Sequence, residues 1–208
     1  MHGINSFSIM KKLLFPFIIC LFVIAGKSQG MLDSMQLATW QEYTDLSEAL
    51  KDPDNVVKLT LRKKKYKSFP MQILQLENLQ YLDLSRNKIT ELPDSIVKLK
   101  YLQYLIVSRT GLERLPANIG EMKNLVHLNV NQNEIEMLPY SFGDLEKLEV
   151  ADLWSNNLDH FPESLSKLKN LKWMDLRNIL IPKNHQDRIQ GMMPDAVIHF
   201  SPPCNCAW

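Results

Sequence analysis

The sequence predicts an α/β solenoid of stacked coils with a parallel sheet, and three observations lead to this fold. First, leucines and other aliphatic residues recur with a period of 23 residues through most of the chain. Second, each recurrence opens with an alternation such as Leu82-Asp83-Leu84, which indicates a strand with one buried face. Third, prolines share the period, which a chance spacing of leucines in a helical protein would not produce; they are Pro70, Pro93, Pro116, Pro139 and Pro162.

The repeat is clearest in the stretch 124–139, and nearly the same pattern precedes and follows it. A single unit cannot bury its own apolar edge, so the units are expected to stack and share a continuous core of leucines. Further along each unit the apolar residues are three apart, as in Ile96 and Leu99. This spacing predicts a tight helical turn or an extended segment on the side opposite the strands.

A polar position follows each strand, and asparagine occupies it in three units, at Asn87, Asn133 and Asn156. An amide at the turn can pair with backbone groups of its own coil and of the neighbouring coil. Thr110 holds the position in one unit and is expected to do part of this work. Lys64 and Ile179 hold it in the end units, so those coils are expected to be irregular.

At these residues the sequence resembles the leucine-rich repeat family, of the 23-residue type with Leu-Pro-x-x-Ile units. The resemblance covers residues 56–182, about six units. It implies a right-handed solenoid with a curved parallel sheet on its concave face, a short helical or irregular convex side, and a binding role for the concave face.

Two end covers are expected to flank the repeats, since an open solenoid exposes its first and last coils. Residues 30–55 predict an N-terminal cap with a short helix over 45–51, begun by Thr44 or Asp45, before a first strand over 57–61. Residues 183–208 predict a C-terminal cap and tail, with a helix over 184–193 and a last strand over 196–200.

Residues 1–29 have the pattern of a secretory signal peptide, because Lys11 and Lys12 precede an apolar run over 13–25. The run is shorter than the roughly 18 residues that a membrane span needs, so no stable transmembrane span is expected after processing. A lipoprotein is disfavoured because Ile19, before Cys20, is not small. We expect export to a periplasm, a cell surface or the medium. A polar helical cap and the lack of an Asn-x-Ser/Thr site favour a bacterial source.

No pattern for catalysis, a cofactor or a metal is present in the sequence. Glycine is scarce, at seven residues, and no glycine-rich phosphate loop occurs. The histidines after the signal fall in different units or caps (His127, His160, His185 and His199). A catalytic domain beyond the repeats is not expected, since only about 26 residues follow Pro182. The pair Cys204 and Cys206 is expected to lie in an exposed tail that could join two molecules.

The residues of most interest are those on the strands that point away from the leucine core, where the concave face would expose large aromatic rings with charges alongside. Aromatic side chains dominate protein interfaces, so we expect a protein or peptide partner. Sugar rings also stack on aromatic rings, and carbohydrate binding is the alternative. Cross-strand stacking that only stiffens the sheet is a third interpretation. The candidate binding residues are Arg62, Tyr81, Asp83, Tyr104, Ile106, Arg109, His127, Asn129, Asp152, Trp154, Trp173 and Asp175.

Charge narrows the choice of partner. Without the three lysines of the signal, the chain has 21 basic and 23 acidic residues, a net of −2, so a nucleic-acid partner is not expected. Basic residues lie toward the N-terminal end of the repeats, among them Arg62, Arg86 and Arg109. Acidic residues on the strands, Asp152 and Asp175, lie toward the other end. This distribution would orient a partner of complementary charge.

Overall fold

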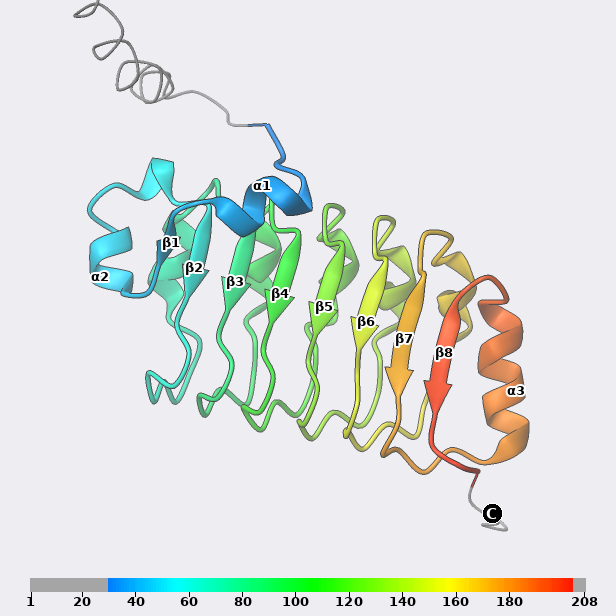
Figure 1. Cartoon of the computed structure of the whole chain (residues 1–208). Coiled ribbons are helices and arrows are strands. Elements are labelled where there is room, and N and C mark those ends of the chain that lie inside the picture. Colours follow the sequence, from blue (N-terminus) through cyan, green and yellow to red (C-terminus); the bar gives the residue numbers. More distant parts are fainter. Residues whose placement is uncertain (1–29, 204–208) are drawn as a thin grey trace, which may run out of the picture.

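A computed structural model describes residues 30–203, which form an open solenoid built around one parallel sheet of eight strands (Figure 1). The strands follow one another across the sheet in chain order, so each coil contacts mainly its two neighbours. This confirms the predicted solenoid. The proposed signal over 1–29 and the pair Cys204 and Cys206 lie outside the described residues. The strands are β1 (Glu42–Tyr43), β2 (Lys58–Thr60), β3 (Tyr81–Asp83), β4 (Tyr104–Ile106), β5 (His127–Asn129), β6 (Val150–Asp152), β7 (Trp173–Leu176) and β8 (Val197–Phe200).

Strands β2 to β7 pair in a register that repeats the 23-residue period of the sequence. Tyr81 lies beside Tyr104, and Tyr104 lies beside His127. Equivalent side chains therefore form rows that cross the sheet at right angles to the strands, with neighbours about 4.8 Å apart. The rows place residues far apart in sequence next to one another.

The convex side consists of short 3-10 helices, one in each repeat. The prolines of the repeat end the preceding segment, and four of them cap these helices directly. Each helix buries its central apolar residue, such as Ile96 or Phe142. The spacing of three between apolar residues suits the 3-10 turn, which confirms the predicted tight helical turn. The helices are η3 (Met71–Gln75), η4 (Asp94–Lys98), η5 (Ile119–Glu121), η6 (Tyr140–Asp144) and η7 (Glu163–Lys167).

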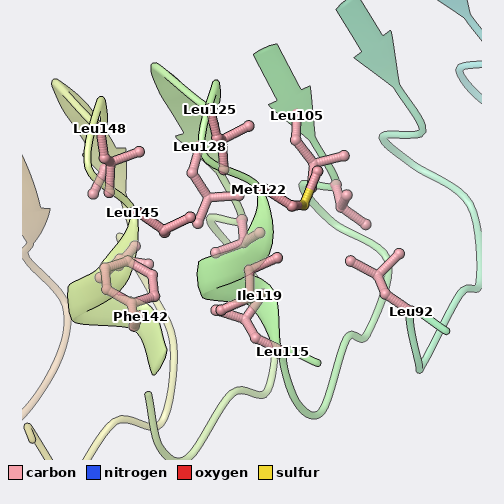
Figure 2. Close-up of a cluster of buried hydrophobic side chains, with 14 of the residues drawn as sticks. Leu92, Leu105, Leu115, Ile119, Met122, Leu125, Leu128, Phe142, Leu145 and Leu148 are labelled. Carbon is pink, nitrogen blue, oxygen red and sulfur yellow. The ribbon is translucent and has the colours of Figure 1, made fainter. Parts of the chain in front are cut away.

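A continuous apolar core fills the space between the sheet and the convex helices. Figure 2 shows Leu105 and Leu128 of neighbouring strands with Met122, Ile119 and Phe142 from the convex side. All five side chains are 2% exposed or less. Because the core runs through every coil, each unit buries its apolar edge on the next one.

The asparagines at the turn pair with two coils at once, as expected. The side-chain N–H of Asn133 donates to the carbonyls of Val107 and Val130, at 2.7 and 2.8 Å, and Asn87 and Asn156 make the equivalent bonds. Thr110 has a shorter side chain, and its hydroxyl lies within hydrogen-bond distance of the Val107 carbonyl of its own coil and of the Asn133 side chain of the next coil, but of no group in the preceding coil. Its partial role is therefore confirmed.

The convex helices pack so closely that two positions, Gly120 and Gly143, have room only for glycine. A Cβ atom on Gly143 would lie 2.0 Å from the carbonyl oxygen of Ser164 in the next coil. A second asparagine row, not predicted from the sequence, also joins the coils on this side. Asn78, Asn124 and Asn170 each donate to a carbonyl 24 residues earlier.

Both ends of the solenoid carry caps, and each adds a strand to the sheet. At the C-terminal end, α3 (Lys183–Met192) and β8 confirm the predicted helix and strand to within one residue. At the N-terminal end, α2 (Leu46–Ala49) begins after Asp45, whose side chain accepts from two backbone N–H groups. The short strand β1, the helix α1 (Ser34–Thr39) and the turn η2 (Pro53–Asn55) were not predicted. Among residues 30–203, no helix has the length and apolar character to cross a membrane.

Candidate functional site

The first row of the concave face is a stack of side chains across β2 to β5. The rings of Tyr81 and Tyr104 stack with centroids 5.9 Å apart, and those of Tyr104 and His127 with centroids 5.6 Å apart. The amino group of Lys58 lies 5.2 Å from the Tyr81 ring centroid, in a cation–π contact. Every member is partly exposed, so the row is ordered yet open to a ligand. We call Lys58, Tyr81, Tyr104 and His127 the N-terminal platform.

The row is interrupted at Val150 of β6 and begins again on β7. Trp173 packs against His199 of β8, with ring centroids 5.7 Å apart and the planes tilted by 51°. Because β8 belongs to the cap, the sequence repeat gave no sign that His199 would meet Trp173. The partly exposed Trp154 lies in the coil of β6, just past its strand. We call Trp154, Trp173 and His199 the C-terminal platform.

Two of the predicted binding carboxylates are used within the molecule instead of lying exposed. Asp83 is 1% exposed and Asp175 is 2% exposed. Asp83 accepts from the backbone N–H of Ser85 and from the Arg62 side chain, each at 2.8 Å. Asp175 makes the equivalent bonds with Arg177. The prediction of carboxylates available to a partner is therefore wrong at these two positions. Asp83 and Asp175 instead hold the turn that follows their strands.

The centre of the face is more open and holds two groups with shifted pKa values. Asp152 accepts from the Asn131 side chain at 2.6 Å, and burial raises its pKa above the ordinary value. Burial lowers the pKa of His127, and the Asp152 charge opposes that shift. Neutral His127 can therefore both stack and form hydrogen bonds. Ile106 and Asn129 lie beside it, partly exposed.

Arg109 lies at the edge of the face instead of within it. Its backbone has a φ of 57°, which turns the chain out of the strand, and its guanidinium contacts the Gln132 side chain. Arg62 instead holds the same repeat position as Trp154, and its side chain donates to Asp83 and Ser85 of the face. The structure therefore brings eleven of the twelve candidates onto the strands and their ends, and leaves Arg109 at the rim.

Two glutamines at the start of β3 and β4 hold the N-terminal segment, and sequence reasoning missed them. Gln80 is fully buried and Gln103 is 6% exposed. Gln80 accepts from the backbone N–H of Leu32, and Gln103 donates to the Leu32 carbonyl, both at 2.8 Å. The segment before α1 therefore crosses the entry ends of these strands (Figure 1). The recurrence of glutamine 23 residues apart was the available signal.

Nothing in residues 30–203 forms a group of three or more histidine, cysteine or acidic side chains placed to hold a metal ion. The face offers aromatic surface, hydrogen-bonding groups and a few charges. Such a surface suits recognition of a ligand by contact.

Comparison with known proteins agrees with this geometry. A sequence family described as "Leucine-rich repeat region" matches residues 55–195. No curated protein matches the chain. A solved leucine-rich repeat protein of Leptospira interrogans is 30% identical, with a TM-score of 0.64, and the match covers 79% of this chain and 47% of that one.

Two solved complexes are also similar in fold. The PEPR1–AtPEP1 complex is 25% identical, with a TM-score of 0.54, over 65% of this chain and 20% of that one. The TLR13–ssRNA13 complex is 29% identical, with a TM-score of 0.62, over 69% of this chain and 21% of that one. The chain thus spans less than half the length of each of these structures.

Proposed function

Because the chain belongs to the leucine-rich repeat family, we propose that it is a non-enzymatic binding protein that recognises a protein or peptide through its concave face. The family and its fold are typically binding scaffolds. The observation that carries the proposal is the pair of aromatic platforms, which leave ring surface exposed on an ordered sheet.

The platforms suit a polypeptide for a physical reason. A half-buried ring fixed by its neighbours loses little conformational freedom when a ligand covers its exposed edge. Aromatic groups in such positions contribute about 2 kcal/mol or more each in many interfaces. The two platforms are separated by Val150, so a ligand that crosses the sheet would touch aromatic groups at both ends and an aliphatic group between them.

The PEPR1–AtPEP1 and TLR13–ssRNA13 complexes suggest that related scaffolds hold a ligand, and the second includes RNA. For this chain we favour a protein ligand over a nucleic acid. The repeats and caps together have more acidic than basic residues, and the concave face pairs two of its arginines with buried carboxylates. A dense phosphate backbone would find few free cations there.

The test is a double substitution, Tyr104→Ala with Trp173→Ala, that removes one ring from each platform. We expect loss of at least about tenfold in affinity for proteins captured from the surface fraction of the source organism. The matched control is Tyr101→Ala with Tyr140→Ala, two tyrosines outside the sheet that are 36% and 65% exposed. Equal capture by both variants, with the fold intact by circular dichroism, would refute the proposal.

Carbohydrate binding is the second candidate, and the exposed ring of Trp154 is what favours it. Indole faces stack on sugar rings in the same way that they stack on other flat groups. A glycan array would decide between the two candidates. Discrete sugar hits that disappear in Trp154→Ala would support the carbohydrate candidate, while an empty array would leave the protein ligand.

We also propose that the protein is exported from a bacterial cell, which rests on the signal pattern in residues 1–29. Expression in the source organism, followed by mass spectrometry of the purified protein, would measure its N-terminus. The expected result is a chain that begins near Gln29. A full-length chain that starts at Met1 and stays inside the cell would refute export.

A further inference from the structure

The turn after each strand exposes every second residue along one edge of the solenoid. In β3's coil, Arg86 and Lys88 are exposed, while Asn87 and Ile89 between them are buried. The coils of β4 to β6 likewise bury the residues between these positions, so three exposed or partly exposed positions per coil line up across this edge. The first coil differs, because Lys64 between them is also exposed. In Figure 1 it is the lower edge, where the strand arrows end. We call this the turn edge and number its coils one to five, for β2 to β6.

Charge changes sign along the turn edge, from positive in the first two coils to negative in the last two. The first coil has three cations and the second has two, while the third has one of each sign. The fourth coil has two acids and the fifth has one. In coil order, the charged residues are Lys63, Lys65 and Lys67; Arg86 and Lys88; Arg109 and Glu113; Glu134 and Glu136; and Asp159. The net charges at these positions are therefore +3, +2, 0, −2 and −1, and the exposed Lys64 adds a fourth cation to the first coil.

Backbone hydrogen bonds hold these coils in register. The N–H of Lys88 donates to the carbonyl of Tyr66 in the previous coil at 2.8 Å. Glu113 and Asp159 donate in the same way to Thr90 and Glu136, each at 3.0 Å. The charges are thus attached to an ordered backbone, with neighbouring coils about 4.8 Å apart.

The charges of the turn edge are also free. All ten side chains are exposed, and none forms an ion pair within the described part of the chain. Elsewhere nine ion pairs are present, some of them between neighbouring coils, such as Arg114 with Glu91. On the turn edge, opposite charges are instead separated by several coils, so they cannot neutralise one another within one molecule.

The sequence of charges excludes two simple partners. A long polyanion or an anionic membrane laid along the whole edge would meet the acids of coils four and five. Only a partner whose charges run in the opposite order along its surface can pair with both the basic and the acidic half of the edge. The charge changes sign at the third coil, so the turn edge of a second molecule, rotated by 180°, presents acids to the cations and cations to the acids.

We propose that two copies of this chain associate through their turn edges, antiparallel, about a two-fold axis that passes the third coil. Coil one of each molecule then faces coil five of the other, and coil two faces coil four. Every contact occurs twice, as a closed two-fold interface requires. The concave faces remain open, so the inference does not depend on the ligand proposed above.

The acidic half of the edge is also shaped to receive a side chain. A hollow of about 360 Å³ lies there, lined by Glu113, Arg114, Glu134, Glu136, Met137 and Asn157. Its one cation, Arg114, is already paired with Glu91, which leaves the three carboxylates of the lining without a partner. Met137 is 57% exposed. In the proposed dimer, the long cations of coil two reach this hollow, with the amino group between carboxylates and the methylene stem on the methionine.

The experiment exchanges charges between two variants. One variant carries Lys65→Glu, Lys67→Glu and Lys88→Glu, and the other carries Glu134→Lys, Glu136→Lys and Asp159→Lys. The control, Lys98→Glu with Lys100→Glu and Lys169→Glu, changes charge equally at exposed lysines outside the turn edge. Sedimentation velocity would measure mass in about 0.1 M and about 1 M NaCl, between which the Debye length falls from about 10 Å to about 3 Å.

We expect the unmodified protein and the control to dimerise in low salt and to dissociate at least about tenfold more readily in high salt. Each edge variant should be a monomer alone, and the equimolar mixture of the two should form a one-to-one dimer. A monomeric unmodified protein, or edge variants that dimerise as it does, would overturn the proposal. So would a mixture that fails to associate. Capture of polyglutamate by a protein that stays monomeric would also overturn it, and would assign the edge to a foreign acidic polypeptide.

Discussion

The middle of the solenoid and its two ends are held together by different means, although they share one repeat. In the middle, Asn133 makes six hydrogen bonds, five to the preceding coil and one within its own coil. At the ends the same position holds Lys64, which is exposed, and Ile179, which is 4% exposed. The first coil is also irregular, since Lys65 has a positive φ in addition to the positive φ that each coil has at the position of Lys63. Register is therefore enforced in the middle, while the ends depend on their caps.

The largest expected effect is at Gly143, in the middle of the solenoid, and Gly191, in the C-terminal cap, is the comparison. Gly143→Ala should lower the free energy of unfolding by about 3 kcal/mol or more, because its Cβ would meet the Ser164 backbone. Gly191→Ala, in open space on α3, should raise it by roughly 0.5–1 kcal/mol. Urea unfolding at neutral pH measures both. A harmless Gly143→Ala would show that the convex helices can separate freely.

Asn133→Ala should cost about 2–4 kcal/mol, since it leaves buried carbonyl and N–H groups without partners. Asn156→Ala should cost less, because that side chain makes three hydrogen bonds and lies nearer the end. The same unfolding measurement compares the two. Equal losses would mean that the number of bonds at this position does not set the strength of a coil.

Thr110 marks the weak point of the middle, and it offers a stabilising change. Thr110→Asn should let the amide donate to Leu84 of the preceding coil as well as to Val107, as Asn133 does one coil later. The expected gain is about 1 kcal/mol. Thermal unfolding would detect it as a higher melting temperature, and a lower one would show that Gly111 and its neighbours cannot fit the longer side chain.

The smallest effect concerns pH. Because burial lowers the pKa of His127 in the folded state, the unfolded chain binds more protons below the ordinary value of 6.5. Stability should therefore fall as pH drops from about 7 to about 5.5, and the fall should be smaller in His127→Gln. The raised pKa of Asp152 acts with the opposite sign, nearer pH 4.

Much of the scaffold could be predicted because its causes lie within one period. Apolar alternation, the prolines and the asparagines each act on their own coil or the next, so a pattern read along the chain also describes the fold. The N-terminal cap was harder to predict from the sequence. Strand β1 has two residues, too few to show a pattern, and helix α1 begins at a capping box between Asp33 and Gln36. Predicted aromatic positions lay on the concave face, whereas Asp83 and Asp175 were misjudged because the pattern along the chain does not show that each is paired with an arginine.

By itself the sequence determined the repeat, the burial of its leucines and the side of the sheet on which each strand residue lies, because these follow from periodicity alone. Only the tertiary structure decided which of those residues are paired within the molecule and which remain available to a partner. Arg62 pairs with a carboxylate of the next coil, and His199 of the C-terminal cap packs against Trp173. The unpaired charges line the turn edge. Such outcomes depend on distances between coils, and a period fixes which residues are equivalent without fixing what each one touches.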